Sequence, residues 1–184
     1  MPADDRSEVD LIRHPKGASH ETCSIRVAYR LGSDRMLDLR YLLKGPLGPI
    51  RVPAARAPAR ADELWKQTCF EAFVAVDGSA AYFEFNLSPS TEWASYRFGS
   101  YRSDRAVESA VSAPGITVDR SADRLQLDAR LALDTIESLR GRNLHLALAA
   151  VVESDSGTLS YWALAHPRAE PDFHHADGFR ISLR

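Results

Sequence analysis

The sequence predicts an all-β protein, an antiparallel β-sandwich that is jelly-roll-like, with at most one or two short helical turns. Three observations predict this fold class. Short segments alternate between apolar and polar residues, as half-buried strands do. Turn-forming residues separate these segments, and no strand–helix–strand unit is present that would build a parallel sheet. A chain of 184 residues, of which 45% are hydrophobic, is long enough for one such domain.

The first predicted hairpin follows an N-terminal extension. Residues 1–19 are expected to be a partly flexible extension, so that the sandwich domain spans residues 20–184. Within residues 22–31, one face carries the side chains of Ile25, Val27, Tyr29 and Leu31. Gly32-Ser33-Asp34 is typical of a turn, and residues 36–43 are the expected partner strand.

A proline-rich loop, residues 45–62, interrupts the alternating pattern. Regular pairing is blocked there by Pro46, Pro49, Pro53 and Pro58. Loops of this length inside a compact domain are uncommon and are often functional or disordered. One hypothesis is therefore that this loop docks a partner protein.

Residues 63–76 fit either a strand or a helix by period alone. Asp77-Gly78 is a hairpin turn signal and a second alternating run, residues 81–88, follows at once, so both segments are predicted to be strands. In that register Phe70, Ala72, Val74 and Val76 share one face of the first strand.

The remainder of the chain continues the same pattern. Asp134 is the expected N-cap of one short helical turn over residues 134–139. Residues 144–152 are almost all apolar, which is typical of a strand buried on both faces. The other predicted strands are residues 93–98, 116–118, 125–131, 158–164 and 179–183.

Charge and cysteine content exclude several classes of protein. The net charge is −2, which argues against nucleic acid or an anionic membrane as a partner. No stretch approaches 18 continuous apolar residues, and the first residues lack the apolar core of a secretory signal. Two cysteines, Cys23 and Cys69, make no disulfide framework and are expected to be free thiols. A cytoplasmic location is expected, and the oligomeric state stays open.

Familiar catalytic motifs are absent: the chain has no G-x-S-x-G, no H-E-x-x-H and no C-x-x-C. Two clusters nevertheless could hold a small polar ligand. The first joins Trp65 at the end of the proline-rich loop with Glu71, and an aromatic face there could stack on a ring. Core packing is the alternative role of that tryptophan.

The second cluster follows the strand at residues 81–88. Glu84, Asn86 and Ser88 share the face opposite Phe83, and the run ends near Trp93. Such a ladder of donors and acceptors beside an aromatic ring suits the hydroxyls and C–H faces of a sugar. An ordinary solvated face is the alternative.

A third cluster, residues 161–179, holds three histidines and several acids. His166, Asp172 and His174 are all of ligand type, but adjacent histidines on an extended chain point apart, and no metal site is predicted. Hydrolysis by Asp172 with a histidine is the least favoured hypothesis, because no nucleophile is placed by the spacing.

The clusters also carry a family resemblance. The chain from about residue 20 to its end resembles the bacterial DOMON-like proteins, which are related to family 9 carbohydrate-binding modules. The segments that carry the resemblance are residues 64–73, 82–89, 93–96, 160–167 and 171–175.

The resemblance implies a β-sandwich that binds a sugar or a haem. For a sugar, it implies stacking on Trp65 and Trp162, with polar contacts from Glu71, Glu84 and Asn86. The haem-binding relatives use an axial methionine, for which this chain offers only Met1 and Met36.

The leading hypothesis is a non-catalytic module for a saccharide or similar small polar ligand, with no cofactor predicted. The residues expected at the site are Trp65, Glu71, Glu84, Asn86, Trp93, Trp162, His166, Asp172 and His174. The alternatives are a haem-binding module with a histidine as axial ligand, and an interaction scaffold.

Overall fold

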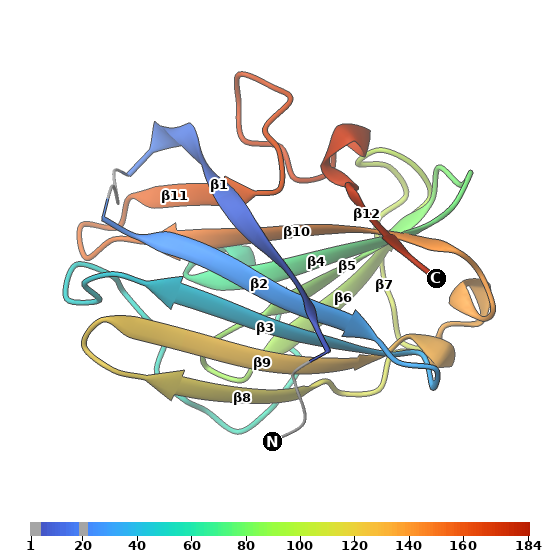
Figure 1. The fold of residues 1–184 in the computed structure, drawn as a ribbon, viewed down its shortest axis with the longest axis horizontal. Helices are drawn as coiled ribbons and strands as arrows, with labels where there is room; N and C mark the ends of the chain where they lie inside the picture. Colours follow the sequence, from blue (N-terminus) through green and yellow to red (C-terminus); the bar gives the residue numbers. More distant parts are fainter. Residues whose placement is uncertain (1–4, 19–21) are drawn as a thin grey trace.

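The computed structural model describes residues 5–18 and 22–184, and it confirms the all-β sandwich. Figure 1 shows one sheet lying in front of a second. The strands are β1 (Ser7–Gly17), β2 (Ser24–Leu31), β3 (Met36–Lys44), β4 (Cys69–Val76), β5 (Tyr82–Leu87), β6 (Trp93–Phe98), β7 (Ala106–Val107), β8 (Gly115–Arg120), β9 (Arg124–Ala132), β10 (Leu144–Glu153), β11 (Leu159–Ala163) and β12 (Ile181–Leu183).

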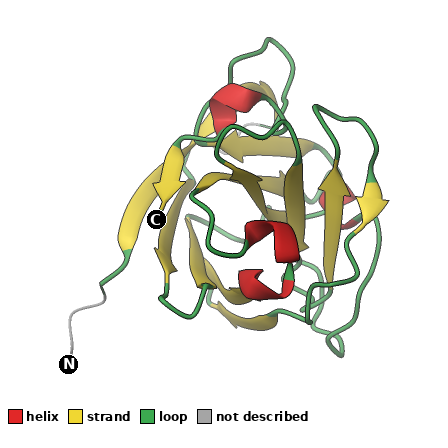
Figure 2. Ribbon diagram, turned by 90° about the vertical axis from the view of Figure 1, so that its right-hand side faces the viewer, coloured by secondary structure: helices red, strands yellow, loops and turns green. Residues whose placement is uncertain are grey.

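Helical structure is confined to short 3-10 turns, which Figure 2 shows in red among the yellow strands and green loops. Asp134 is not the N-cap that the sequence suggested, because the turn begins at Leu133 and its N-cap is Ala132, which makes no side-chain capping bond. The turns are η1 (Leu64–Lys66), η2 (Leu133–Thr135), η3 (Glu137–Leu139) and η4 (Ala176–Gly178). No helix in the described part of the chain is long and apolar enough to cross a membrane.

Every pair of neighbouring strands is antiparallel. The first sheet has the order β1-β2-β3-β9-β8, and the second has the order β7-β6-β5-β4-β10-β11-β1. Strand β12 pairs with the first residues of β10. Strand β1 belongs to both sheets and joins them along one edge, since residues 7–11 pair with β2 and residues 12–17 pair with β11.

The position of β1 corrects the expectation of a flexible extension. Residues 7–17 are a strand of the domain, with Leu11 5% exposed in the core. The sequence signal is weak because the register shifts between Arg13 and Gly17, where Pro15 cannot donate a backbone hydrogen bond. Residues 1–4 and 19–21 of the expected extension and its junction lie outside the described residues.

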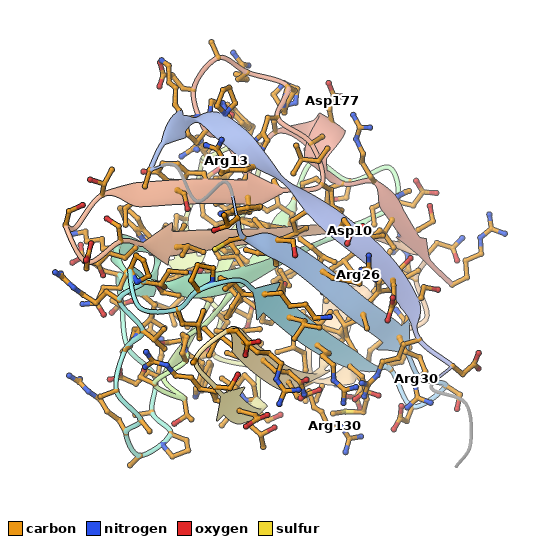
Figure 3. The ribbon with its side chains drawn as sticks, turned by 60° about the vertical axis from the view of Figure 1, so that its left-hand side comes forward. Asp10, Arg13, Arg26, Arg30, Arg130 and Asp177 are labelled. Carbon is orange, nitrogen blue, oxygen red and sulfur yellow. The ribbon has the colours of Figure 1, made fainter. Side chains whose placement is uncertain are left out.

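The main core lies between the two sheets. The predicted inward faces are confirmed, because Val27 and Leu39 of the first sheet belong to one buried cluster with Phe70 and Phe85 of the second. The outer face of the first sheet is charged and exposed, with ion pairs such as Arg26 with Asp10. Figure 3 labels several of these side chains on β1, β2 and β9.

The outer face of the second sheet is different, because it is also largely buried. A second cluster there includes Phe73, Tyr82, Tyr96 and Phe98. These side chains alternate with the inward ones, so the strands of the second sheet have apolar contacts on both sides. The segments that cover this face define the candidate site.

The proline-rich loop is pinned to the sandwich rather than free. Its backbone N–H groups at Leu47 and Arg51 donate to Ala122 and Glu153, and its carbonyl at Ala59 accepts from Trp93. The loop leads directly into η1, which contains Trp65. Cys23 and Cys69 are free thiols, as expected.

Candidate functional site

A cleft of about 370 Å³ opens on the outer face of the second sheet, within the range of small-molecule sites. Strands β4, β5, β10 and β11 supply its floor. The turn η1, the connection from β6 to β7 and the segment before η4 supply its walls. The lining side chains are those of Trp65, Glu71, Glu84, Phe98, Arg102, Arg105, Val151, Tyr161, Pro171, Phe173 and His174.

Two glutamates on the floor form a pair, called here the carboxyl dyad, Glu71 and Glu84. They are diagonal neighbours on adjacent strands, because Glu71 pairs with Asn86 and Glu84 pairs with Phe73. Both point to the outer face yet are only 3% and 5% exposed. Two acidic groups that would ordinarily lie in water are therefore held together in a recess.

Their surroundings favour the protonated forms. Burial raises the pKa of Glu71 well above its ordinary value, and the neighbouring Glu84 raises it further. Burial also raises the pKa of Glu84, although the hydrogen bond from Asn86 opposes this. Because interacting carboxyls titrate together, the dyad keeps a proton at pH values where exposed glutamates have lost theirs.

The two carboxyls differ in their partners. Oε1 of Glu84 accepts a 2.7 Å hydrogen bond from Nδ2 of Asn86, and its Oε2 lies 3.8 Å from Nε2 of His174. Across residues 5–18 and 22–184, the carboxyl of Glu71 has neither a hydrogen bond nor an ion pair. The cleft is the space that this carboxyl faces.

His174 is held by a hydrogen bond at Nδ1. The hydroxyl of Tyr82 accepts a 3.1 Å bond from the backbone N–H of Arg102 and is hydrogen-bonded to Nδ1 of His174 at 2.8 Å. Nε2 of the same ring faces Glu84. Burial, together with the charge of Arg102, lowers the pKa of His174 to about 4, so the ring is neutral at pH 7.

Asp172 organises the rim without lining the cleft. Its carboxylate accepts bonds from the hydroxyl of Tyr101 at 2.6 Å, from Nη2 of Arg102 at 2.9 Å and from the backbone N–H of His174 at 3.1 Å. Although burial acts in the opposite direction, the bonds from Tyr101 and Arg102 lower the pKa of this carboxyl. Asp172 thus holds Arg102 and His174 in place as an ionised group.

Trp65 is the exposed aromatic wall of the cleft. Its side chain is 42% exposed, whereas Trp93 and Trp162 are 9% and 5% exposed. Tyr161, Phe173 and Phe98 also line the cleft. The site therefore combines one accessible indole face, further aromatic edges and a buried acidic floor.

Three residues expected at the site lie elsewhere. Trp162 packs in the core between the sheets, where its Nε1 donates to Oγ of Ser160, so it is not a stacking position in the cleft. Trp93 belongs to the same core. Nε2 of His166 donates to the backbone carbonyl oxygen of Ile12, 2.7 Å away, and the ring lies beside that of His14, so His166 does not line the cleft.

Other lining residues were not among those expected from the sequence. Tyr161 takes the outward position on β11, and its neighbour Trp162 necessarily points to the opposite face. Arg102 and Arg105 come from a segment that appeared irregular, and they reach the cleft because Asp172 and Tyr96 hold them. Asn86 supports Glu84 from behind and is itself fully buried.

Comparison with known proteins places the fold. No protein-family model matches the chain, and no curated protein matches it. A Bacteroides uniformis protein described provisionally as carbohydrate-binding aligns with a TM-score of 0.64 at 15% identity, over 95% of this chain and 84% of that one. At this identity, the likeness shows a shared fold and nothing about the ligand.

Two structures of a family 9 carbohydrate-binding module from Caldicellulosiruptor kristjanssonii also align. The complex with cellotriose has a TM-score of 0.48 at 9% identity, over 84% of this chain and 71% of that one. The complex with glucose has a TM-score of 0.45 at 11% identity, over 82% and 73%. Scores this low support no conclusion of their own.

Proposed function

We propose that this protein is a non-catalytic module that binds a saccharide in the cleft over the second sheet. One observation carries the proposal: the accessible face of Trp65 lines the same 370 Å³ recess as the buried carboxyls of Glu71 and Glu84. A pyranose ring presents C–H faces to an indole and hydroxyls around its edge. Those hydroxyls need both donors and acceptors.

The carboxyl dyad supplies both the donor and the acceptors that the sugar hydroxyls need. With one shared proton it offers a hydroxyl donor together with several acceptor oxygens, and Arg102 and Arg105 add donors on the wall. The shared fold with a protein described provisionally as carbohydrate-binding is compatible with this assignment. The weight of the proposal nonetheless rests on the cleft.

Titration calorimetry with a panel of mono- and disaccharides tests the proposal directly. Tryptophan fluorescence gives a second readout, because Trp65 is the exposed one of the three tryptophans. We expect binding to change the emission of the wild-type protein. Trp65→Ala should weaken binding by at least about tenfold, the factor expected when an aromatic anchor is removed.

Ile12→Ala is the matched control, since Ile12 is 59% exposed and does not line the cleft. The proposal fails if no saccharide binds at millimolar concentration, or if Trp65→Ala and Ile12→Ala bind alike. Turnover of aryl glycosides that is lost in Glu71→Gln would show an enzyme instead of a binding module.

No observation favours the haem-binding alternative over this one. Of its candidate axial ligands in the described part of the chain, His174 alone lines the cleft, and its Nδ1 is hydrogen-bonded to Tyr82. Met36 lies on β3 in the other sheet, and His166 is engaged with the backbone of β1. A haem titration without a Soret band in the wild-type protein would close that alternative.

A further inference from the structure

Among the described residues, neither carboxyl of the dyad forms an ion pair with an arginine of the cleft. Glu71, Glu84, Arg102 and Arg105 all line it. Arg102 pairs with Asp172 at 2.9 Å, and Asp172 also pairs with Arg168 at 3.8 Å. The guanidinium centre of Arg105 lies 3.9 Å from the centre of the Tyr96 ring.

The lack of a direct partner for Glu71 has a physical consequence. An ionised carboxylate without a partner is costly to bury, and Glu71 is such a group when both members of the dyad are ionised. A positive charge placed against the dyad would give its carboxylates the direct partner that they lack. His174 does not supply it near pH 7, because its ring is neutral there.

The walls of the cleft suit a cation as well as a sugar. Trp65, Phe98, Tyr161 and Phe173 surround the acidic floor. Aromatic faces attract an ammonium group through their quadrupoles, and the attraction grows when water is displaced. A neutral saccharide uses these rings only for packing.

We propose that the saccharide bound in this cleft carries a free amino group, and that its ammonium binds against Glu71 and Glu84. This inference rests on the proposed saccharide-binding function and narrows it to amino sugars. The exposed Trp65 packs on the ring, while the dyad takes the charged substituent.

The hydrogen-bonding capacity of the dyad matches an ammonium group. Oε1 of Glu84 is occupied by Asn86, which leaves Oε2 of Glu84 and both carboxyl oxygens of Glu71. None of these three oxygens accepts a hydrogen bond from the described residues. An ammonium has three N–H donors and no acceptor, so the numbers of donors and acceptors agree.

Proton exchange gives a second signature. Below its raised pKa the dyad of the empty cleft keeps a proton, and an incoming ammonium takes the place of that proton, so that binding in this pH range releases it. The titratable and charged groups around the dyad, from every element packed against it, are Tyr41, Cys69, Tyr82, Tyr96, Arg102, Arg105, Tyr161, Asp172 and His174.

The experiment compares three ligands that share one ring: glucosamine, glucose and N-acetylglucosamine. Calorimetry at about pH 6.5, where primary amines are charged, measures each affinity in two buffers of different ionisation heat. We expect glucosamine to bind about 10- to 100-fold more tightly than the other two, the range of a charged hydrogen bond. Its binding should release up to one proton, and that of glucose none.

Glu71→Gln keeps the shape of the side chain and removes its charge. Whatever its affinity for glucose itself, this variant should bind glucosamine no more tightly than glucose and should release no proton on binding it. Glu137→Gln, on the exposed turn η3, is the matched control and should behave like the wild type. The comparison of ligands on the wild-type protein needs no variant, so the test survives if Glu71→Gln does not fold.

The outcomes separate the two proposals. If glucose binds at least as tightly as glucosamine, or if Glu71→Gln keeps the preference, the amino-sugar inference is wrong and saccharide binding stands. Tighter binding of glucuronate would also overturn the inference, because Arg105 would then dominate the charge selection. If no saccharide binds, the proposed function itself fails.

Discussion

Replacing Glu71 by glutamine should change how the stability of the protein depends on pH. Burial and Glu84 raise the pKa of Glu71 well above its ordinary value of 4.5. Between that value and the raised pKa, the folded protein holds a proton that the unfolded chain has lost. The contribution of Glu71 to stability is therefore fully present below pH 4.5 and is lost as the pH rises through the raised pKa.

The magnitude follows from linkage. One proton held by the folded state lowers the free energy of unfolding by about 1.4 kcal/mol for each pH unit of that window. Glu71→Gln carries no such proton. The difference in unfolding free energy, variant minus wild type, should therefore rise with that slope and favour the variant at higher pH.

The unfolding free energy must be compared between Glu71→Gln and the wild type because His174 also titrates. Its pKa is lowered from 6.5 to about 4, so between these values the unfolded chain binds a proton that the folded protein does not. Its contribution to stability rises with pH in that window, opposite to that of Glu71. The two slopes offset each other in the wild type, and subtraction removes the part due to His174.

Urea unfolding followed by tryptophan fluorescence at a series of pH values measures the difference. The slope of free energy against urea should stay the same in both proteins, which shows that the exposed area on unfolding is unchanged. Glu137→Gln reports the same substitution on a side chain exposed to water. A difference curve for Glu71→Gln that is flat above pH 4.5 would refute the reasoning, because the carboxyl would then be no harder to ionise in the folded protein.

Three further substitutions test the fold and the site. In urea unfolding, Trp162→Ala should destabilise the protein by about 3–5 kcal/mol, because Trp162 is buried in the core. Trp65→Ala should destabilise it by less than ~1 kcal/mol, because Trp65 is exposed. Equal losses of stability would contradict this placement of the two side chains. Gly17→Ala should cost about 2 kcal/mol or more in thermal unfolding, since its φ is +101° and a Cβ would lie 2.3 Å from the carbonyl oxygen of Leu159; an unchanged Tm would show that β1 can shift there. Tyr82→Phe should destabilise the protein by about 1–2 kcal/mol in urea unfolding, because it removes the hydroxyl that is hydrogen-bonded to the backbone N–H of Arg102 and to the imidazole of His174. An unchanged stability would mean that these two hydrogen bonds contribute nothing.

The strands were predictable because alternation is local. Residues 24–31 and 69–76 show which side chains share a face without any knowledge of their neighbours in space. Strand β1 was not predictable, because it changes its pairing partner from β2 to β11 midway and a register shift separates the two parts. Its alternation therefore changes phase within one strand.

The candidate site was predictable in part for a related reason. Alternation along residues 81–88 places Glu84 and Asn86 on one face, whereas the register of β4 with β5, which brings Glu71 opposite Asn86, comes from the structure. The choice between Tyr161 and Trp162 could not be made, because both faces of this sheet are covered by apolar side chains. Period alone does not say which covered face is the core and which is the cleft.

The sequence by itself determined the antiparallel sandwich and the face that Glu84 shares with Asn86, because alternation and turn residues act over a few positions. The tertiary structure decided that this face is recessed, that Trp65 is exposed while Trp162 is buried, and that Arg102 is tied to Asp172. These properties depend on segments far apart in the chain that cover the second sheet. The shift in the pKa of Glu71 depends on that covering, which no local pattern encodes.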